Sequence, residues 1–145
     1  MFRVEIRDLQ SDGSLVDLKD ILPALPRKAT YLLWSILDLE AIGDLGPGRN
    51  ILDLEETIKN SPFGLQISWH ELGTLSKSVF QIMNTTIVGV TSTDKFPRFI
   101  RSEIESLSEV IIEMIDSTVW VISTADQEFV RSIQEKFREL NMFTE

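Results

Sequence analysis

Segments with the apolar period of a β-strand alternate along this chain with segments that have the apolar spacing of a helix. Residues 2–9 form the clearest strand, because Phe2, Val4 and Ile6 alternate with charged residues. A period of two places these three side chains on one face. The rest of the chain is predicted as helix, strand, helix, strand, helix, strand, a strand hairpin and a last helix. This order restricts the fold to a sheet with helices packed on it.

Residues 30–42 fit two structures. In a helix, Leu33, Ile36, Leu37 and Glu40 would share a face, and Gly43 would cap the C-terminal end. In a strand, both faces would be apolar up to the first charges, which is typical of a central strand. We favour the strand.

Local signals place the remaining elements. Helix starts are predicted by capping residues at Ser14 with Asp17, Asn50, Ser68 with Glu71, and Thr124 with Gln127. The Ser68 helix is expected to continue through Ile82, and a strand is expected over 85–91. Residues 94–106 are expected to be polar and irregular, with a helical turn after Pro97 as the alternative. Asp116-Ser117 is expected to join strands 110–115 and 118–123 as a hairpin.

These signals predict the fold class. We expect one α+β domain over residues 1–145, with a mixed β-sheet of five or six strands, helices packed on it and a C-terminal helix. The strand order does not follow from the sequence.

The charge of the chain excludes several partners. The formal net charge is −9 at pH 7, which disfavours nucleic acid and anionic membrane surfaces, because both are bound through clustered Lys and Arg. The absence of cysteine excludes disulfides and thiolate metal sites. The N-terminus lacks the apolar core of a signal peptide. We therefore expect a cytoplasmic protein without a cofactor or metal.

A stretch without positive charge indicates the kind of partner. Between Ser102 and Val130 there is no Lys or Arg, although seven carboxylates lie there. Lys95, Arg98 and Arg101 precede the stretch and could neutralise part of it, and the last two carboxylates fit the first turn of a helix. The others favour a basic protein partner. The candidate partner-binding residues are Glu103, Glu105, Glu109, Glu113 and the aromatic Trp120.

Residues that could support catalysis are few. His70 is the single histidine and falls in the first turn of the Ser68 helix, where the helix dipole disfavours its protonated form. Asp38 and Glu40 would lie on one side of a strand, as a carboxylate pair of a hydrolase does. A hydrolase using Asp38, Glu40 and His70 is therefore the enzymatic alternative, and a non-catalytic protein is favoured over it.

Three segments carry a resemblance to known proteins. Residues 34–46 (WSILDLEAIGDLG), 67–72 (ISWHEL) and 112–120 (IEMIDSTVW) are similar to segments of small acidic bacterial proteins of unassigned function. In general type the chain also resembles the immunity proteins of bacterial toxin systems. That resemblance implies a small cytoplasmic α+β domain that neutralises a cognate toxin by binding it.

Three hypotheses of function follow. The first is a cytoplasmic binding protein without catalytic activity, of the immunity type, that presents carboxylates to a basic toxin. The second is the small hydrolase described above. The third is a symmetric homodimer in which one sheet edge or apolar patch is covered by a second copy.

Overall fold

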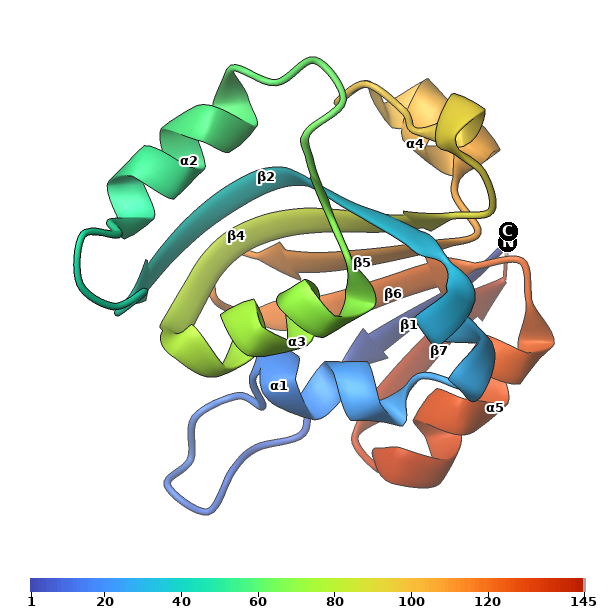
Figure 1. Ribbon diagram of the computed structural model, residues 1–145. Coiled ribbons are helices and arrows are strands. Elements are labelled where there is room, and N and C mark those ends of the chain that lie inside the picture. Colours follow the sequence, from blue (N-terminus) through green and yellow to red (C-terminus); the bar gives the residue numbers. More distant parts are fainter. Residues whose placement is uncertain (145) are drawn as a thin grey trace.

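A seven-stranded antiparallel sheet forms the centre of the protein (Figure 1). The computed structural model describes residues 1–144. The strand order is β3-β2-β4-β5-β6-β1-β7, and every neighbouring pair is antiparallel. The strands are β1 (Phe2–Ile6), β2 (Leu33–Gly43), β3 (Leu65–Ile67), β4 (Val79–Val90), β5 (Val110–Ile115), β6 (Val119–Thr124) and β7 (Leu140–Thr144).

The α+β class is confirmed, but the mixed sheet of five or six strands is wrong in two respects. The sheet gains a strand because residues 140–144 add β7 beside β1. It is antiparallel for two reasons. α2 and α4 each join strands that are antiparallel neighbours, β2 to β3 and β4 to β5. The crossovers through α3 and α5 join parallel strands, but β2 lies between β3 and β4, and β1 lies between β6 and β7.

Helices cover both faces of this sheet (Figure 1). α1 (Leu18–Ile21), α3 (Trp69–Ser78) and α5 (Gln127–Lys136) lie over one face, and α4 (Arg101–Leu107) lies over the other. α2 (Ile51–Lys59) runs alongside β2. Short 3₁₀ turns occupy Leu22–Ala24, Arg27–Tyr31 and Thr93–Lys95. None of the helices in residues 1–144 combines the length and apolarity needed to cross a bilayer.

The two faces bury very different amounts of apolar surface. The face under α1, α3 and α5 holds the main core, with Trp34, Trp120 and Phe129 among its largest side chains. The opposite face has a small core made of Leu37, Val88, Ile104 and Ile111. The second face is therefore free to carry charged side chains over much of its area.

Several local predictions are confirmed. Residues 33–43 form a strand, and the Asn50 side chain accepts from the backbone N–H groups of Leu52 and Asp53. Ser68 and Glu71 form the expected capping box. Asp116 and Ser117 both have positive φ, 47° and 58°, as a tight hairpin turn requires.

Other boundaries differ from the prediction. α1 is capped by Asp17 with Asp20, because Ser14 instead donates its hydroxyl to Asp12. α3 ends at Ser78, and the apolar residues that continued its stripe belong to β4. In the segment 94–106, where a helical turn after Pro97 was the alternative to an irregular structure, residues 101–107 form the two-turn helix α4 around the buried Ile104.

Candidate functional site

On the side away from β4, the second half of β2 lies next to α2 rather than next to another strand. β3 pairs with β2 only from Trp34 to Ile36, so the following residues of β2 would leave unpaired N–H and C=O groups at a sheet edge. α2 covers this edge, and the Glu55 carboxylate accepts a hydrogen bond from the Ala41 N–H at 2.8 Å. The buried Ile58 packs α2 against the core.

A register shift in β2 determines which face Asp38 and Glu40 occupy. Between Ile36 and Asp38 the pairing with β4 is irregular, and Leu37 is the extra residue. Beyond this bulge Asp38 pairs with Thr86 and Glu40 with Asn84. Both carboxylates therefore lie on the face that α4 covers, on the same side as each other, as the period of two predicts.

An acidic groove of about 680 Å³ lies between β2, α2 and the segment before α4. Asp38 and Glu40 enter it from β2, Glu55 and Glu56 from α2, and Lys59 is its single basic lining residue. Within residues 1–144 none of these four carboxylates forms an ion pair. Glu40 accepts only a neutral hydrogen bond there, from the Asn84 side chain at 3.1 Å.

The electrostatics of the acidic groove are unfavourable to its own charges. Desolvation raises the pKa of Asp38 above its ordinary value, and the negative charges of Glu40 and Glu55 raise it further. Like charges held together in this way favour a bound cation. Two large apolar side chains on the lining, Leu52 and Phe99, are 66% and 56% exposed.

The carboxylates that the sequence singled out as partner-binding lie on α4, on β5 and between them, and they differ in whether a cation pairs with them. Glu103 bonds to Arg98, which holds the pKa of that carboxyl below its usual value. Glu113 makes a bidentate pair with Arg101 at 2.7 and 3.2 Å. Internal neutralisation by the preceding arginines therefore accounts for two of the four. Glu105 is exposed and Glu109 half-buried, without an ion pair in the described part of the chain.

Trp120, the fifth predicted partner-binding residue, lies in the core. Its side chain is 1% exposed and its indole N–H donates to the Val16 carbonyl at 2.7 Å. A partner cannot reach it in this structure. The strand of Trp120 does pair with the strand of Glu113, but Trp120 points to the opposite face, into the main core.

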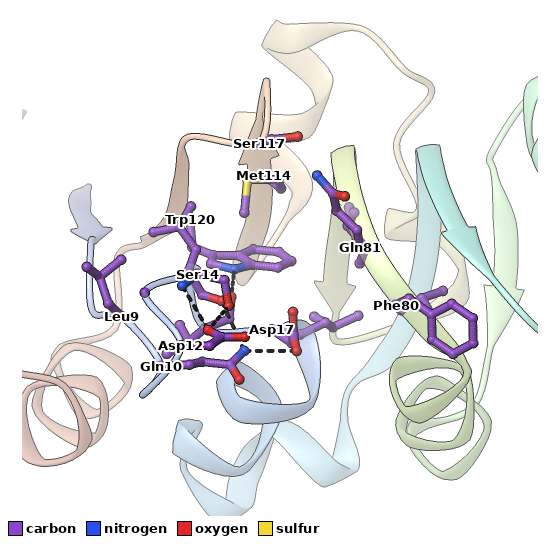
Figure 2. A pocket seen from close by; sticks show the side chains of 16 residues that line it. Leu9, Gln10, Asp12, Ser14, Asp17, Phe80, Gln81, Met114, Ser117 and Trp120 are labelled. Atoms are coloured by element: carbon purple, nitrogen blue, oxygen red, sulfur yellow. Dashed lines mark hydrogen bonds between the residues drawn. The ribbon is translucent and has the colours of Figure 1, made fainter.

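Trp120 instead borders a second hollow, of about 610 Å³, between residues 9–18, β4 and the hairpin of β5 and β6 (Figure 2). Polar side chains of the loop over residues 9–18 bond to one another beside this hollow. Gln10 donates to Asp17 at 3.0 Å and to the Leu15 carbonyl at 3.1 Å, and Ser14 donates to Asp12 at 2.6 Å. Figure 2 shows this cluster beside the indole ring. These bonds hold the loop over the sheet, so the hollow has a structural role.

The residues of the predicted hydrolase do not come together. Asp38 and Glu40 line the acidic groove, but His70 does not. His70 is exposed in the first turn of α3, the helix whose Leu72 packs into the main core on the opposite face of the sheet. In residues 1–144 no group of three or more His, Cys, Asp or Glu side chains is arranged to hold a metal ion.

Sequence reasoning missed Glu55 and Glu56. They sit in a predicted amphipathic helix, where a solvent-facing carboxylate is ordinary. Their approach to Asp38 depends on the way α2 folds back along β2, and no local pattern contains that information. The only usable signal was that Asp38 and Glu40 fall on one side of a predicted strand.

This fold and site define a small α+β protein with an unneutralised acidic groove. Comparison of the chain with models of protein families, with curated proteins and with solved structures gave no match in any of the three. The resemblances drawn from the sequence therefore stay predictions.

Proposed function

We propose that this protein is a non-catalytic binding protein whose acidic groove receives a basic segment of a protein partner. One observation carries the proposal: four carboxylates line the groove without an ion pair in the described residues. The sequence resemblance to immunity proteins favours one particular partner, a toxin that this protein would neutralise by binding it.

The rest of the acidic groove suits such a partner. A Lys or Arg side chain entering it would relieve the repulsion that raises the pKa of Asp38. Leu52 and Phe99 would offer apolar contact to the same segment, and contact of this kind supplies much of the binding energy at protein interfaces. The charge complementarity would increase the association rate and select against acidic partners.

A pair of charge-matched variants tests the location of the site. The groove variant combines Asp38→Asn, Glu40→Gln and Glu56→Gln, and it leaves Glu55 in place because this residue caps β2. The control combines Glu105→Gln, Glu109→Gln and Asp116→Asn, which removes the same charge from the acidic stretch. Binding to an arginine-rich peptide and to the products of neighbouring genes is then measured at low and high salt.

We expect the groove variant to lose binding and the control to keep it. Binding by the wild type should weaken as salt rises. Peptide-induced NMR shifts should fall on residues 38–40, 52–59 and 99. Loss of binding in the control alone would move the site to the acidic stretch and contradict the proposal, as would binding that does not depend on salt.

A further inference from the structure

Within the described residues 1–144, β7 leaves one edge of the sheet open. It pairs with β1 on one side and is the last strand of the sheet on the other. The Arg7 N–H donates to the Glu139 carbonyl at 2.9 Å, and in an antiparallel pair such bonds recur at every second residue. The backbone groups of Asn141 and Phe143 therefore face β1. Those of Leu140, Met142 and Thr144 face outward.

The composition of this edge offers no protection against pairing. Exposed edges in natural proteins usually carry Lys, Pro or a bulge, or are covered by another element. Residues 140–144 contain no charge and no proline, and their register with β1 is regular. Met142 and Phe143 are 49% and 48% exposed, so each face of the strand has an apolar side chain next to the open edge.

The charge around β7 also differs from that of the whole chain. Residues 131–145 contain Arg131, Lys136 and Arg138 against Glu135, Glu139 and Glu145, a formal net charge of zero in a chain of −9. Two copies of an acidic protein repel each other over most of their surfaces. The mixed charges beside β7 allow two copies to approach there with the least repulsion.

We infer that two copies of this chain pair through β7, antiparallel, about a two-fold axis at Met142. In this register Met142 faces Met142 of the second copy, and Leu140 faces its Thr144. All outward N–H and C=O groups of the strand then find partners. Phe143 of each copy lies opposite Asn141 of the other on the face that α4 covers. The two sheets become one.

Proline at position 142 is a selective test. Met142→Pro removes only an outward N–H, which is the position that an edge strand tolerates, so the β1–β7 ladder stays intact. The mass of the full chain is measured in solution by light scattering and sedimentation. We expect twice the monomer mass of 16.5 kDa for the wild type, and a dissociation constant at least about tenfold higher for the variant.

Met142→Lys supports the same conclusion without proline. It keeps the N–H and places two like charges across the axis, so it should also give monomers. Phe80→Lys is the matched control, since Phe80 is a similarly exposed apolar residue far from β7 in the sheet order, and it should stay dimeric. Circular dichroism verifies the fold of each variant.

A cysteine scan tests the register, because the chain has no cysteine of its own. The Cα atoms of a hydrogen-bonded antiparallel pair lie about 5.5 Å apart, within the range that a disulfide bridges. Met142→Cys should therefore cross-link rapidly under mild oxidation. Leu140→Cys and Phe80→Cys should not.

The outcomes separate this inference from the proposed function. A wild type that is monomeric at high concentration would overturn the inference, and so would a dimer that survives both Met142→Pro and Met142→Lys. The dimer should persist or strengthen as salt rises, because salt screens the repulsion between two acidic chains. Binding of a basic peptide should weaken under the same conditions, so either result can fail alone.

Discussion

The two ends of the sheet are finished in opposite ways. At the β2 end, the short β3 pairs with three residues of β2, and α2 covers the strand beyond them. At the β7 end, five uncharged residues stand at the edge with nothing beside them in the described chain. The covered edge also forms the acidic groove, because the same helix that protects β2 brings Glu55 and Glu56 to it.

The contrast shows that one residue can both protect a sheet edge and form part of a binding site. Glu55 caps a backbone N–H of β2 and adds negative charge next to Asp38. The open edge has no such residue and keeps its backbone groups available for another strand. We therefore assign binding of a different protein to the covered edge and self-association to the open one.

The largest effect is expected from the packing that holds α2 in place. Ile58→Ala removes a side chain that is 2% exposed and should lower the free energy of unfolding by about 2–5 kcal/mol. Leu52→Ala on the same helix, and Met142→Ala at the open edge, should each change it by less than about 1 kcal/mol. Urea unfolding measures all three. If all three variants lost the same free energy of unfolding, side-chain packing would not distinguish the two edges.

Glycine substitutions give the next largest effect. Gly64 has φ of 73°, and a Cβ there would lie 2.4 Å from the Ile36 carbonyl oxygen of β2. Gly64→Ala should cost at least about 1–2 kcal/mol of stability from the backbone conformation alone. Gly73 in α3 has nothing within 4 Å of its Cβ position, so Gly73→Ala should stabilise by about 0.5–1 kcal/mol. Thermal unfolding should shift in opposite directions for the two variants.

The sequence predicted the local features of both edges better than their assembly. The Asn50 cap, the Ser68–Glu71 box and the strand over 33–43 depend on neighbouring residues, and the structure confirms them. β7 was missed because Phe137 and Leu140 continue the apolar stripe of α5, although the helix ends at Lys136. In this short edge strand only Leu140 is half-buried. Its alternation of buried and exposed residues is therefore too weak a signal to outweigh the helical spacing of Phe137 and Leu140.

The acidic groove could be predicted only in part, because charge position in sequence says little about pairing in space. In the described residues, cations that precede the stretch without positive charge pair with four of its seven carboxylates. Arg98 pairs with Glu103, Arg101 with Glu113, and Lys28 with both Asp126 and Glu128. The unpaired carboxylates of the acidic groove lie instead in the first half of the chain. Asp38 and Glu55 meet only because α2 returns along β2.

A smaller effect is expected from the hydrogen bond that caps β2. Glu55→Ala leaves the Ala41 N–H without its acceptor and should cost about 1 kcal/mol. Glu55→Gln keeps an acceptor oxygen and removes a charge that repels Asp38, so its stability should match the wild type within about 0.5 kcal/mol. Amide hydrogen exchange at Ala41 should accelerate in the first variant only. If both variants accelerate it equally, the carboxylate does not act as a cap.

The smallest effect is a pH dependence with opposite signs at two carboxylates. The folded pKa of Asp38 is raised above its ordinary value of 3.8, so its ionised form opposes folding. That penalty is absent below pH 3.8 and develops as pH rises through the folded pKa. Asp38→Asn should therefore equal the wild type in acid and become the more stable protein towards neutral pH.

Glu103 provides the opposite case on the same face of the sheet. Arg98 lowers the pKa of Glu103 below 4.5, so this pair stabilises the fold above pH 4.5 and loses that contribution as pH falls through the folded pKa. Glu103→Gln should be less stable than the wild type at neutral pH and equal to it in strong acid. Urea unfolding across this pH range compares both variants. A common sign would show that the acidic groove does not hold its carboxylates against their own repulsion, and the case for a cationic partner there would fail with it.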